Sequence, residues 1–236
     1  MNAVIDVKSL VKRFSGTAVL RELDLRVERG TTVGLLGTNG AGKSTLIKCL
    51  VGLLRRDSGG CSVLGEDSFS LSPAAKARIG YVPQVISFMP WLTSLELMNY
   101  TASFYPRWNQ ALGHRLTGEW SIPLKQRVGT LSVGQTQKLA ILLAVAYEPE
   151  LLILDEPAAA LDPLARRQFL QFLIDVASPG ERTILFSTHL TTDLERVADH
   201  VAVMKAGRFH WVGPLEELKE QTHLNLEESF LEMHNG

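Results

Sequence analysis

The sequence predicts an α/β fold that is built around a mainly parallel core sheet. Three short apolar runs, at 32–36, 151–154 and 183–187, have the length and composition of strands that are buried on both faces. Segments with helical spacing follow the first two runs, at 44–50 and 163–173. Strands that alternate with helices favour parallel pairing through right-handed crossovers.

The amino-terminal part has the two-residue period of strands that cover one face of a core. Ile5 and Val7 alternate with charged residues, and residues 23–27 show the same alternation. We therefore expect a small antiparallel sheet. Composition also predicts a turn at 56–60 and a further strand at 61–65.

The carboxy-terminal part predicts a hairpin and a short helix. Two strand-like segments, 201–204 and 209–212, flank an Ala-Gly turn at 206–207. At 225–233, a segment that begins with Asn has one apolar helical face, which predicts a last short helix.

Between about 85 and 147 the spacing of apolar residues becomes helical. Two capping boxes, at 93–96 and 132–135, begin helices here. We expect the first helix to include Phe104 and the second to end at Tyr147, before Pro149. The prediction is thus one domain, residues 1–236, with an α/β core from 1–84 and 148–236, which includes the antiparallel part, and an inserted, mainly helical subdomain at 85–147.

The composition is that of a globular protein without a strongly charged partner. The 236 residues are 45% hydrophobic and 21% charged, and the formal net charge is −1. Basic residues near the start are interleaved with acidic ones, which predicts a solvated sheet face rather than a nucleic-acid surface. These basic residues are Lys8, Lys12, Arg13, Arg21, Arg26 and Arg29.

The cysteines and the apolar runs indicate in which cellular compartment the protein works. Cys49 and Cys61 are too few for a disulfide framework or a metal site, and their predicted burial fits a reducing cytosolic setting. The longest apolar run, 139–147, is too short to cross a bilayer, and the first residues lack a secretory signal pattern. If the protein works at a membrane, we expect another chain to supply the spanning helices.

Residues 37–44, Gly-Thr-Asn-Gly-Ala-Gly-Lys-Ser, match the phosphate-loop pattern G-x-x-x-x-G-K-[ST] between a predicted strand and a predicted helix. Glycines let such a loop turn its backbone N–H groups around phosphate oxygens, and the helix N-terminus adds its dipole. The Lys43 ammonium can reach the β- and γ-phosphates, and the Ser44 hydroxyl can hold Mg²⁺. The expected nucleotide contacts are Gly37, Thr38, Asn39, Gly40, Ala41, Gly42, Lys43, Ser44 and Thr45.

Two adjacent carboxylates, Asp155 and Glu156, end the apolar run at 151–154. Alternation along a strand gives neighbouring side chains different directions, so the two need not do the same work. One carboxylate can hold the metal ion, and the other can orient and deprotonate an attacking water. Alone, the pair is equally consistent with a turn. Together with a phosphate loop upstream, it favours Mg²⁺-dependent phosphoryl chemistry.

Further motifs carry a resemblance to a known family. Leu-Ser-Val-Gly-Gln at 131–135 resembles the LSGGQ signature of the ABC ATPases. That family's order is also kept by Tyr-Val-Pro-Gln at 81–84, Leu-Asp-Glu-Pro at 154–157, Ala-Leu-Asp at 160–162 and Ser-Thr-His at 187–189. The resemblance covers essentially the whole chain, and the ordered combination is highly specific. It implies an α/β P-loop NTPase of the ABC type, the ATP-binding cassette of a transporter, with ATP and Mg²⁺ as its ligands.

The resemblance implies roles for residues outside the phosphate loop. Phe14 would stack on the adenine, with a core Phe as the alternative. Asp155 would hold Mg²⁺, and Glu156 would be the catalytic base. Gln84 would contact Mg²⁺ or the attacking water, and His189 would touch the γ-phosphate and hold Glu156 in place.

The resemblance also implies contacts across a dimer interface. The helix that begins at 132 would aim its N-terminus at the γ-phosphate of a second copy. The sequence departs from the family pattern at two places: Val133 replaces a glycine, and three alanines at 158–160 replace the usual Thr-Ser-Gly. The nucleotide-site residues expected in this region are Ser132, Gly134, Gln135 and Asp162.

The implied assembly is two copies, or one copy and a paralogue, that close around two Mg·ATP and drive a separate permease at the cytoplasmic face of a membrane. The chain's length and its ending resemble those of exporter cassettes. A soluble ABC-type ATPase of an assembly machinery, such as iron–sulfur cluster scaffolding, is the alternative. Apolar residues near Gln84 could receive a permease helix or pack the subdomain core: Phe88, Met89, Trp91, Phe104, Tyr105 and Trp108.

Overall fold

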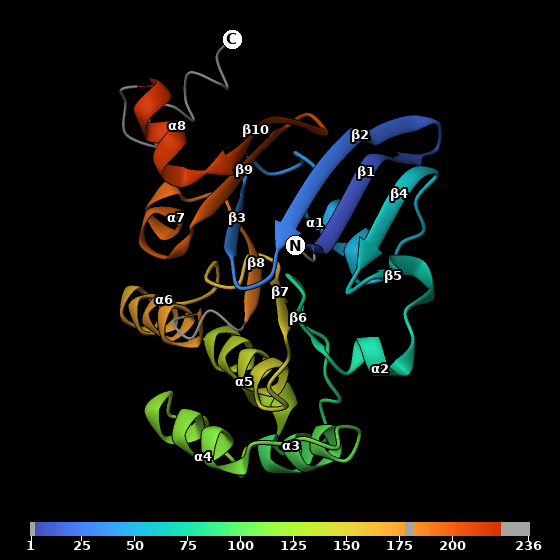
Figure 1. Ribbon diagram of the computed structural model, residues 1–236. Coiled ribbons are helices and arrows are strands. Elements are labelled where there is room, and N and C mark those ends of the chain that lie inside the picture. The colour runs from blue at the N-terminus through green and yellow to red at the C-terminus, as the bar shows by residue number, and fades with distance from the viewer. Residues whose placement is uncertain (1–2, 178–181, 223–236) are drawn as a thin grey trace.

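The computed structural model describes residues 3–177 and 182–222, which form two β-sheets and the helices around them. Figure 1 shows the core sheet in the middle of the molecule, with the antiparallel sheet beside it at the upper right and the helices α3 and α4 at the bottom. The predicted α/β class, with an antiparallel sheet and an inserted helical region, is confirmed.

The antiparallel sheet has four strands in the order β2-β1-β4-β5. Their bounds are β1 Ala3–Phe14, β2 Thr17–Glu28, β4 Ser58–Val63 and β5 Glu66–Asp67. The prediction of a turn through residue 60 is wrong, because β4 already begins at Ser58. Gly59 has a φ of +83°, and a Cβ there would lie 2.2 Å from the Ser9 carbonyl oxygen. Gly59 and the adjacent Gly60 therefore permit close pairing of β4 with β1 beside a bulge, and they do not mark a loop.

The core sheet has six strands in the order β10-β9-β3-β8-β7-β6. Every pair is parallel except the hairpin of β9 and β10, as the sequence predicts. All residues of β3, β7 and β8 are buried, which explains their almost continuous apolar composition. The bounds are β3 Thr32–Leu36, β6 Ile79–Val82, β7 Leu151–Leu154, β8 Thr183–Thr188, β9 His200–Lys205 and β10 Arg208–Pro214.

Side-chain alternation along the core strands divides the buried residues into two clusters. One cluster joins a face of the core sheet to α1 (Lys43–Leu50) and to the antiparallel sheet. The other joins the opposite face to α5 (Val133–Val145), α6 (Pro163–Ala177) and α7 (Thr191–Val197). Cys49 and Cys61 belong to the first cluster, and burial raises the pKa of the Cys49 thiol to about 12. The core sheet therefore holds α1 between the two sheets.

The inserted region contains α3 (Ser94–Ala102), α4 (Gln110–Glu119) and a 3₁₀ turn at Val128–Thr130, followed by α5. Both predicted capping boxes are formed, at Thr93 and at Ser132. The prediction that the first helix includes Phe104 is wrong. The residue before a proline avoids the helical region, so the helix ends before Tyr105 and Pro106.

Three shorter elements complete the described chain. They are a 3₁₀ turn at Ser68–Ser70, α2 (Pro73–Lys76) and α8 (Leu215–Thr222). The helix expected at 225–233 lies outside the described residues. Across 3–177 and 182–222, none of the helices has the length and apolar character that a bilayer crossing requires.

Candidate functional site

Four neighbouring strands of the core sheet end at one edge, and a predicted site residue follows each of them. The phosphate loop follows β3, Gln84 follows β6, Asp155 and Glu156 follow β7, and His189 follows β8. These strands run parallel, so their carboxyl ends lie together. Crevices at this edge are the usual ligand sites of open α/β sheets.

The phosphate loop surrounds a cavity of about 290 Å³. Two of its glycines have positive φ angles, +83° at Gly40 and +114° at Gly42, where α1 begins. A Cβ on Gly37 would lie 2.5 Å from the Met204 carbonyl oxygen, so this position also requires glycine. The cavity is lined by Val19, Thr38, Asn39, Gly40, Gly42, Lys43, Ser44, Thr45, Gln84 and Glu156.

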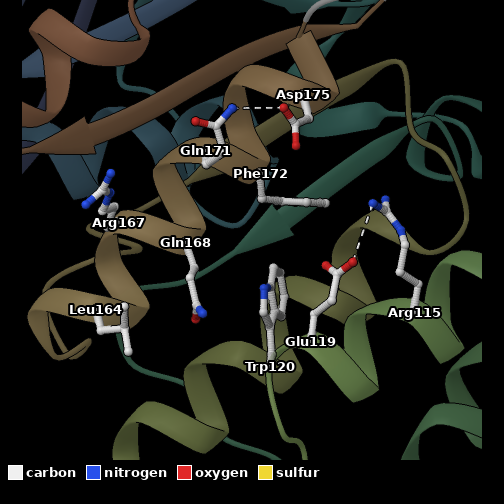
Figure 2. Close-up of a pocket in the computed structure, with 9 residues that line it drawn as sticks. All are labelled: Arg115, Glu119, Trp120, Leu164, Arg167, Gln168, Gln171, Phe172 and Asp175. Carbon is white, nitrogen blue, oxygen red and sulfur yellow. Dashed lines mark hydrogen bonds and ion pairs between the residues drawn. The ribbon is translucent and has the colours of Figure 1, made fainter.

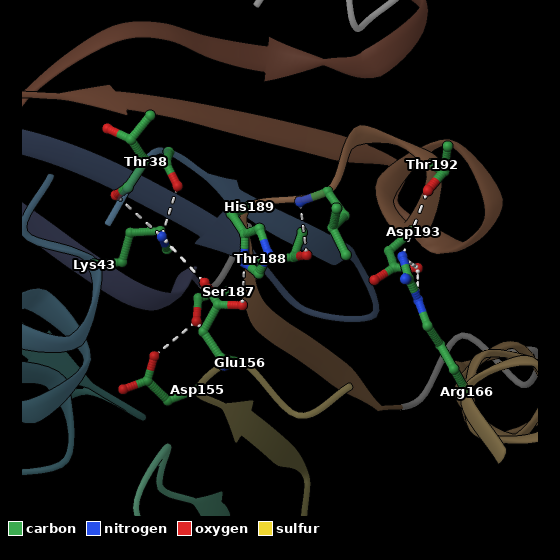
Figure 3. Close-up of polar contacts among 12 residues, drawn as sticks. Thr38, Lys43, Asp155, Glu156, Arg166, Ser187, Thr188, His189, Thr192 and Asp193 are labelled. Carbon is green, nitrogen blue, oxygen red and sulfur yellow. Dashed lines mark hydrogen bonds and ion pairs between the residues drawn. The ribbon is translucent and has the colours of Figure 1, made fainter. Parts of the chain in front are cut away.

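Lys43 is buried, and its ammonium is surrounded by oxygen atoms (Figure 3). Nζ donates to the carbonyl oxygens of Gly37 at 2.6 Å and Thr38 at 3.3 Å, and lies 3.1 Å from Oε1 of Glu156. The two carbonyl oxygens accept hydrogen bonds from the ammonium, and the Glu156 carboxylate pairs with its charge. The buried charge of Lys43 is thus balanced within the cavity.

Glu156 is held from three sides. Its other carboxylate oxygen, Oε2, lies 3.0 Å from Nδ1 of His189, and its backbone N–H donates to Oγ of Ser187 at 2.8 Å. Its φ of +49° is uncommon for a residue with a side chain. Strained backbone at a polar site persists only where the surroundings fix it, as Lys43, Ser187 and His189 do here. The Glu156 carboxylate is consequently oriented before any substrate arrives.

Asp155 is buried beside Glu156 but has a different environment. Its Oδ1 accepts a hydrogen bond from Oγ of Ser187 at 2.7 Å. Its Oδ2 is also buried and has no hydrogen-bond partner within the described part of the chain. A buried carboxylate oxygen without a partner costs free energy unless a cation or a proton donor meets it.

This donor set fits Mg²⁺. The described residues contain no group of three or more His, Cys, Asp or Glu side chains that could hold a metal ion. Mg²⁺ does not need such a group, because it usually binds one or two carboxylates, several waters and the phosphates of the substrate. Asp155 supplies a carboxylate here, and the Ser44 and Gln84 side chains line the adjoining cavity.

Several predicted site residues lie outside the cavity lining. Ala41 is buried in the loop, where its backbone N–H donates to the Thr38 carbonyl oxygen at 3.2 Å. Phe14, at the end of β1, is 46% exposed, so the alternative of a core Phe is wrong. The Lys12 Nζ lies 5.5 Å from the centroid of its ring. Neither the Ala41 side chain nor the Phe14 side chain lines the cavity.

The signature residues also lie apart from the cavity, at the start of α5. Ser132 and Gln135 bond each other's backbone N–H groups through their side chains, at 2.9 Å and 3.2 Å. Asp162 caps α6 by accepting from the Ala165 N–H at 2.9 Å, which holds the pKa of its carboxyl below the usual value. A Cβ on Gly134 would lie 3.5 Å from the Ala160 carbonyl oxygen, so the two segments are neighbours.

Sequence reasoning missed two features that Figure 3 draws. Ser187 joins Asp155 to Glu156, and the signal was available because Ser187 begins the Ser-Thr-His motif. Arg166 on α6 donates from Nε to Oδ1 of the buried Asp193 on α7 at 2.8 Å. That pair connects the helix after Asp162 to the helix after His189. No sequence pattern indicates a pair between residues 27 positions apart on two different helices.

A cavity of about 530 Å³ lies away from the strand ends, between α4 and α6 (Figure 2). Trp120 and Phe172 are buried beside it, with ring centroids 5.1 Å apart in an edge-to-face arrangement. Its rim carries charges of both signs, including Arg115, Glu119 and Asp175. It has neither a phosphate loop nor a buried carboxylate without a partner, so its size alone does not make it the catalytic site.

Comparison with known proteins bears on the family of the chain. The family model described as ABC transporter matches residues 20–159. The chain belongs to the ABC transporter ATP-binding subunits. Its fold matches a solved structure titled "Structure of ATP binding subunit of ABC transporter" with a TM-score of 0.88 and 30% identity, covering 98% of this chain and 99% of that one. The chain is therefore an ATPase cassette of this family.

Two curated relatives carry names of transport systems. The Nod factor export ATP-binding protein I of Burkholderia lata is 35% identical over 212 residues, which are 87% of this chain and 69% of the relative. The bacitracin transport ATP-binding protein BcrA of Bacillus licheniformis is 31% identical over 229 residues, 96% of this chain and 75% of the relative. The comparisons do not support the alternative of an assembly factor.

Proposed function

We propose that this ATPase powers a membrane exporter, and that Glu156 is the base that activates the attacking water. The observation that carries the catalytic assignment is the buried Glu156 carboxylate, which contacts both Lys43 of the phosphate loop and His189. A base must be oriented toward the reacting water and shielded from bulk solvent. The direction of transport rests on the relative that is named for Nod factor export.

The phosphate loop binds ATP through its backbone N–H groups and Lys43. Asp155, Ser44 and Gln84 hold Mg²⁺, which when bound neutralises phosphate charge. Thr45 adds a hydroxyl at the same helix N-terminus. His189 touches the γ-phosphate and keeps the Glu156 carboxylate aimed at the water. The positions of these side chains in the cavity and at the adjoining strand ends support the assignments, and the resemblance to the ABC ATPases suggests the individual roles.

The pairing of Lys43 with Glu156 links substrate binding to activation of the base. While the Lys43 ammonium lies 3.1 Å from Oε1, that oxygen is paired with a cation and is not available to a water molecule. The γ-phosphate of ATP competes for the same ammonium, because its charge is larger. Once Lys43 turns to the phosphate, Oε1 is free to accept a proton from water. The base then acts only when substrate is present.

A second cassette completes the nucleotide site. Ser132, Gly134 and Gln135 stand at the N-terminus of α5, where the helix dipole favours an anion. Val133, between them, is 72% exposed. We place the γ-phosphate held by the partner's phosphate loop at this N-terminus, with Asp162 at the interface. Phe14 stacks on the adenine when the nucleotide is bound.

An apolar surface on α3 and the segment before it receives the permease. Of the six residues expected there, Trp91 and Phe104 are exposed, at 66% and 64%. Phe88, Met89 and Trp108 pack against the core instead. The ring of Tyr105 stacks on that of Tyr147, with centroids 3.8 Å apart. Exposed neighbours extend the surface: Val85, Leu95 and Tyr100.

Docking through this surface would place the cassette on the cytoplasmic face of the membrane. Burying a few hundred Å² of apolar area at about 25 cal/mol per Å² gives enough free energy for a specific contact, in which two large anchors dominate. The surface belongs to the inserted helical region, which begins directly after Gln84. Movement of Gln84 with the nucleotide can therefore reach the permease.

The test is to search the neighbouring reading frames for a multi-span membrane protein and to coexpress the cassette with any such candidate permease. The wild type should pellet with membranes and support ATP-dependent efflux of a substrate from the cell. The Glu156→Gln variant should pellet equally but not transport. Replacing Trp91 and Phe104 with Gln should release the cassette while ATP binding stays intact. Failure of the wild type to pellet with that protein or to support efflux would contradict the proposal.

A further inference from the structure

Tyr81 carries a hydroxyl that neither the fold nor the proposed catalytic residues use. It lies in β6, three residues before Gln84, and its Oη atom is buried without a hydrogen-bond partner in the part of the chain that the structure describes. Buried tyrosine hydroxyls usually find a partner. Tyr147 shows the usual case, because its hydroxyl donates to the Ile79 carbonyl oxygen at 2.7 Å.

The position of Tyr81 in the sheet places it beside Asp155. Tyr81 pairs with Ile153 across β6 and β7, and the Asp155 N–H donates to the Val82 carbonyl oxygen at 2.9 Å. Alternation puts Ile153 and Asp155 on the same face, so Asp155 is the diagonal neighbour of Tyr81. Diagonal neighbours are within reach of long aromatic side chains. Both Tyr81 and Ile153 pack into the cluster that contains α1.

Two buried polar atoms without partners therefore occur on one face: Oη of Tyr81 and Oδ2 of Asp155. The Tyr81 hydroxyl can donate a hydrogen bond, and Oδ2 of Asp155 can accept one. Burial, helped by the charge of Asp155, raises the pKa of Tyr81 to about 12. The phenol consequently keeps its proton near neutral pH and remains a donor. The two atoms do not bond directly in the structure, so a water molecule is needed to join them.

We propose that Tyr81 is a positioning residue for the Mg²⁺ site, whose hydroxyl orients Oδ2 of Asp155 through an ordered water. This inference rests on the proposed assignment of Asp155 as the metal carboxylate. The hydroxyl restrains the direction of Oδ2 and satisfies the second lone pair of that oxygen. Outer hydrogen bonds of this kind strengthen metal sites without touching the ion. Tyr81 does not contact the nucleotide in this proposal.

Tyr81→Phe removes only the hydroxyl. Because that hydroxyl has no direct protein partner and the bridging water can keep its bond to Oδ2, the variant without nucleotide should unfold at nearly the same temperature as the wild type. Binding of a fluorescent ATP analogue in EDTA should be unchanged. With Mg²⁺ present, affinity should fall by about three- to tenfold, the effect of one lost hydrogen bond. The Mg²⁺ concentration for half-maximal binding should rise by the same factor.

Tyr147→Phe is the matched control, because it removes a hydroxyl that does have a protein partner. It should lower the unfolding temperature and leave the Mg²⁺ dependence of binding unchanged. Equal Mg²⁺ dependence in Tyr81→Phe and the wild type would overturn the positioning role. If binding by the wild type itself were indifferent to Mg²⁺, the assignment of Asp155 would fail as well. The Mg²⁺ dependence of the wild type alone therefore separates a failure of the Tyr81 proposal from a failure of the Asp155 assignment.

Discussion

The phosphate-loop cavity and the start of α5 differ in how their polar groups are used. Around the cavity, Lys43, Glu156 and His189 are directed at one another in one chain. At the start of α5, Ser132 and Gln135 satisfy only each other's backbone, and the neighbouring Val133 is exposed. The first region is organised by the fold of a single chain. The second presents a helix N-terminus outward, where we propose that the partner's γ-phosphate binds.

This difference separates two sources of catalytic control. Groups that are already aligned need no reorganisation when the substrate arrives, so they determine the rate of the chemical step. In the proposed function, the surface at the start of α5 needs a second chain and so determines when that step is permitted. Variants in the first region should change chemistry or nucleotide binding in a monomer. Variants in the second should change assembly while leaving monomer binding intact.

The largest expected effect is on turnover in Glu156→Gln. An amide cannot accept the proton from water, so phosphate release should fall by about 10²- to 10⁴-fold. ATP affinity should be retained, because the phosphate loop is unaltered. Glu150→Gln is a matched control at the opposite edge of the sheet, and it should keep normal turnover. Phosphate release near the wild-type rate in Glu156→Gln would remove Glu156 from the role of base.

Lys43→Ala tests whether the paired charges are needed by the fold as well as by the substrate. ATP binding should be lost, because the loop no longer supplies a mobile cation. Stability should also fall, by about 3 kcal/mol, because the Glu156 charge remains buried without its ammonium partner.

The double variant Lys43→Ala/Glu156→Gln separates the two effects. It should recover most of the lost stability in urea unfolding, since the unpaired charge is gone, but should still fail to bind ATP. Equal stability of the single and double variants would show that His189 alone balances Glu156.

Gly134→Asp breaks the second region without damaging the first. Negative charge in the first turn favours the α5 helix itself, so unfolding is not expected. The new side chain has space, because a Cβ there makes only an ordinary contact with the Ala160 carbonyl oxygen at 3.5 Å. It should repel a partner's γ-phosphate.

The readout is dimerisation in the Glu156→Gln background, where ATP is not consumed. With Mg·ATP, gel filtration should give a dimer for Glu156→Gln and a monomer when Gly134→Asp is added. ATP affinity of the monomer should be the same in both. Dimers of equal stability would place the contact between cassettes elsewhere.

How much of this could be predicted depends on the range of the interactions. The apolar runs at 32–36, 151–154 and 183–187 predicted the core strands, because burial on both faces leaves a local pattern. The capping boxes at Thr93 and Ser132 were equally local.

The missed features depend on contacts that a single segment does not encode. Gly59 and Gly60 resemble a turn until strand β1 is known to pair beside them. The bond from Ser187 to Asp155, and the ion pair of Arg166 with Asp193, join residues 32 and 27 positions apart. Motifs located the strand ends, but only the sheet order put Gln84, Asp155 and His189 at one edge.

The smallest expected effect concerns Glu150. Like Glu156, it forms ion pairs with basic side chains, but it lies at the surface. Hydrogen bonds from Arg78 at 2.6 and 2.8 Å, joined by Arg29 at 2.9 Å, lower the pKa of its carboxyl to about 2. A carboxyl whose pKa is lower in the folded chain stabilises the fold at pH values above its unfolded pKa of about 4.5. That stabilisation should disappear as the pH falls from about 4.5 to about 2.

The three groups are more than a third exposed, so solvent screening reduces the expected loss to about 1 kcal/mol in Glu150→Gln. Urea unfolding at pH 7 and at pH 3 measures it. The difference in free energy of unfolding between the wild type and Glu150→Gln should be smaller at pH 3 than at pH 7. ATP turnover at pH 7 should be the same in both. A loss of turnover would mean that the edge of the sheet opposite the cavity also affects the catalytic groups. The distinction between pairing for chemistry and pairing for stability would then fail.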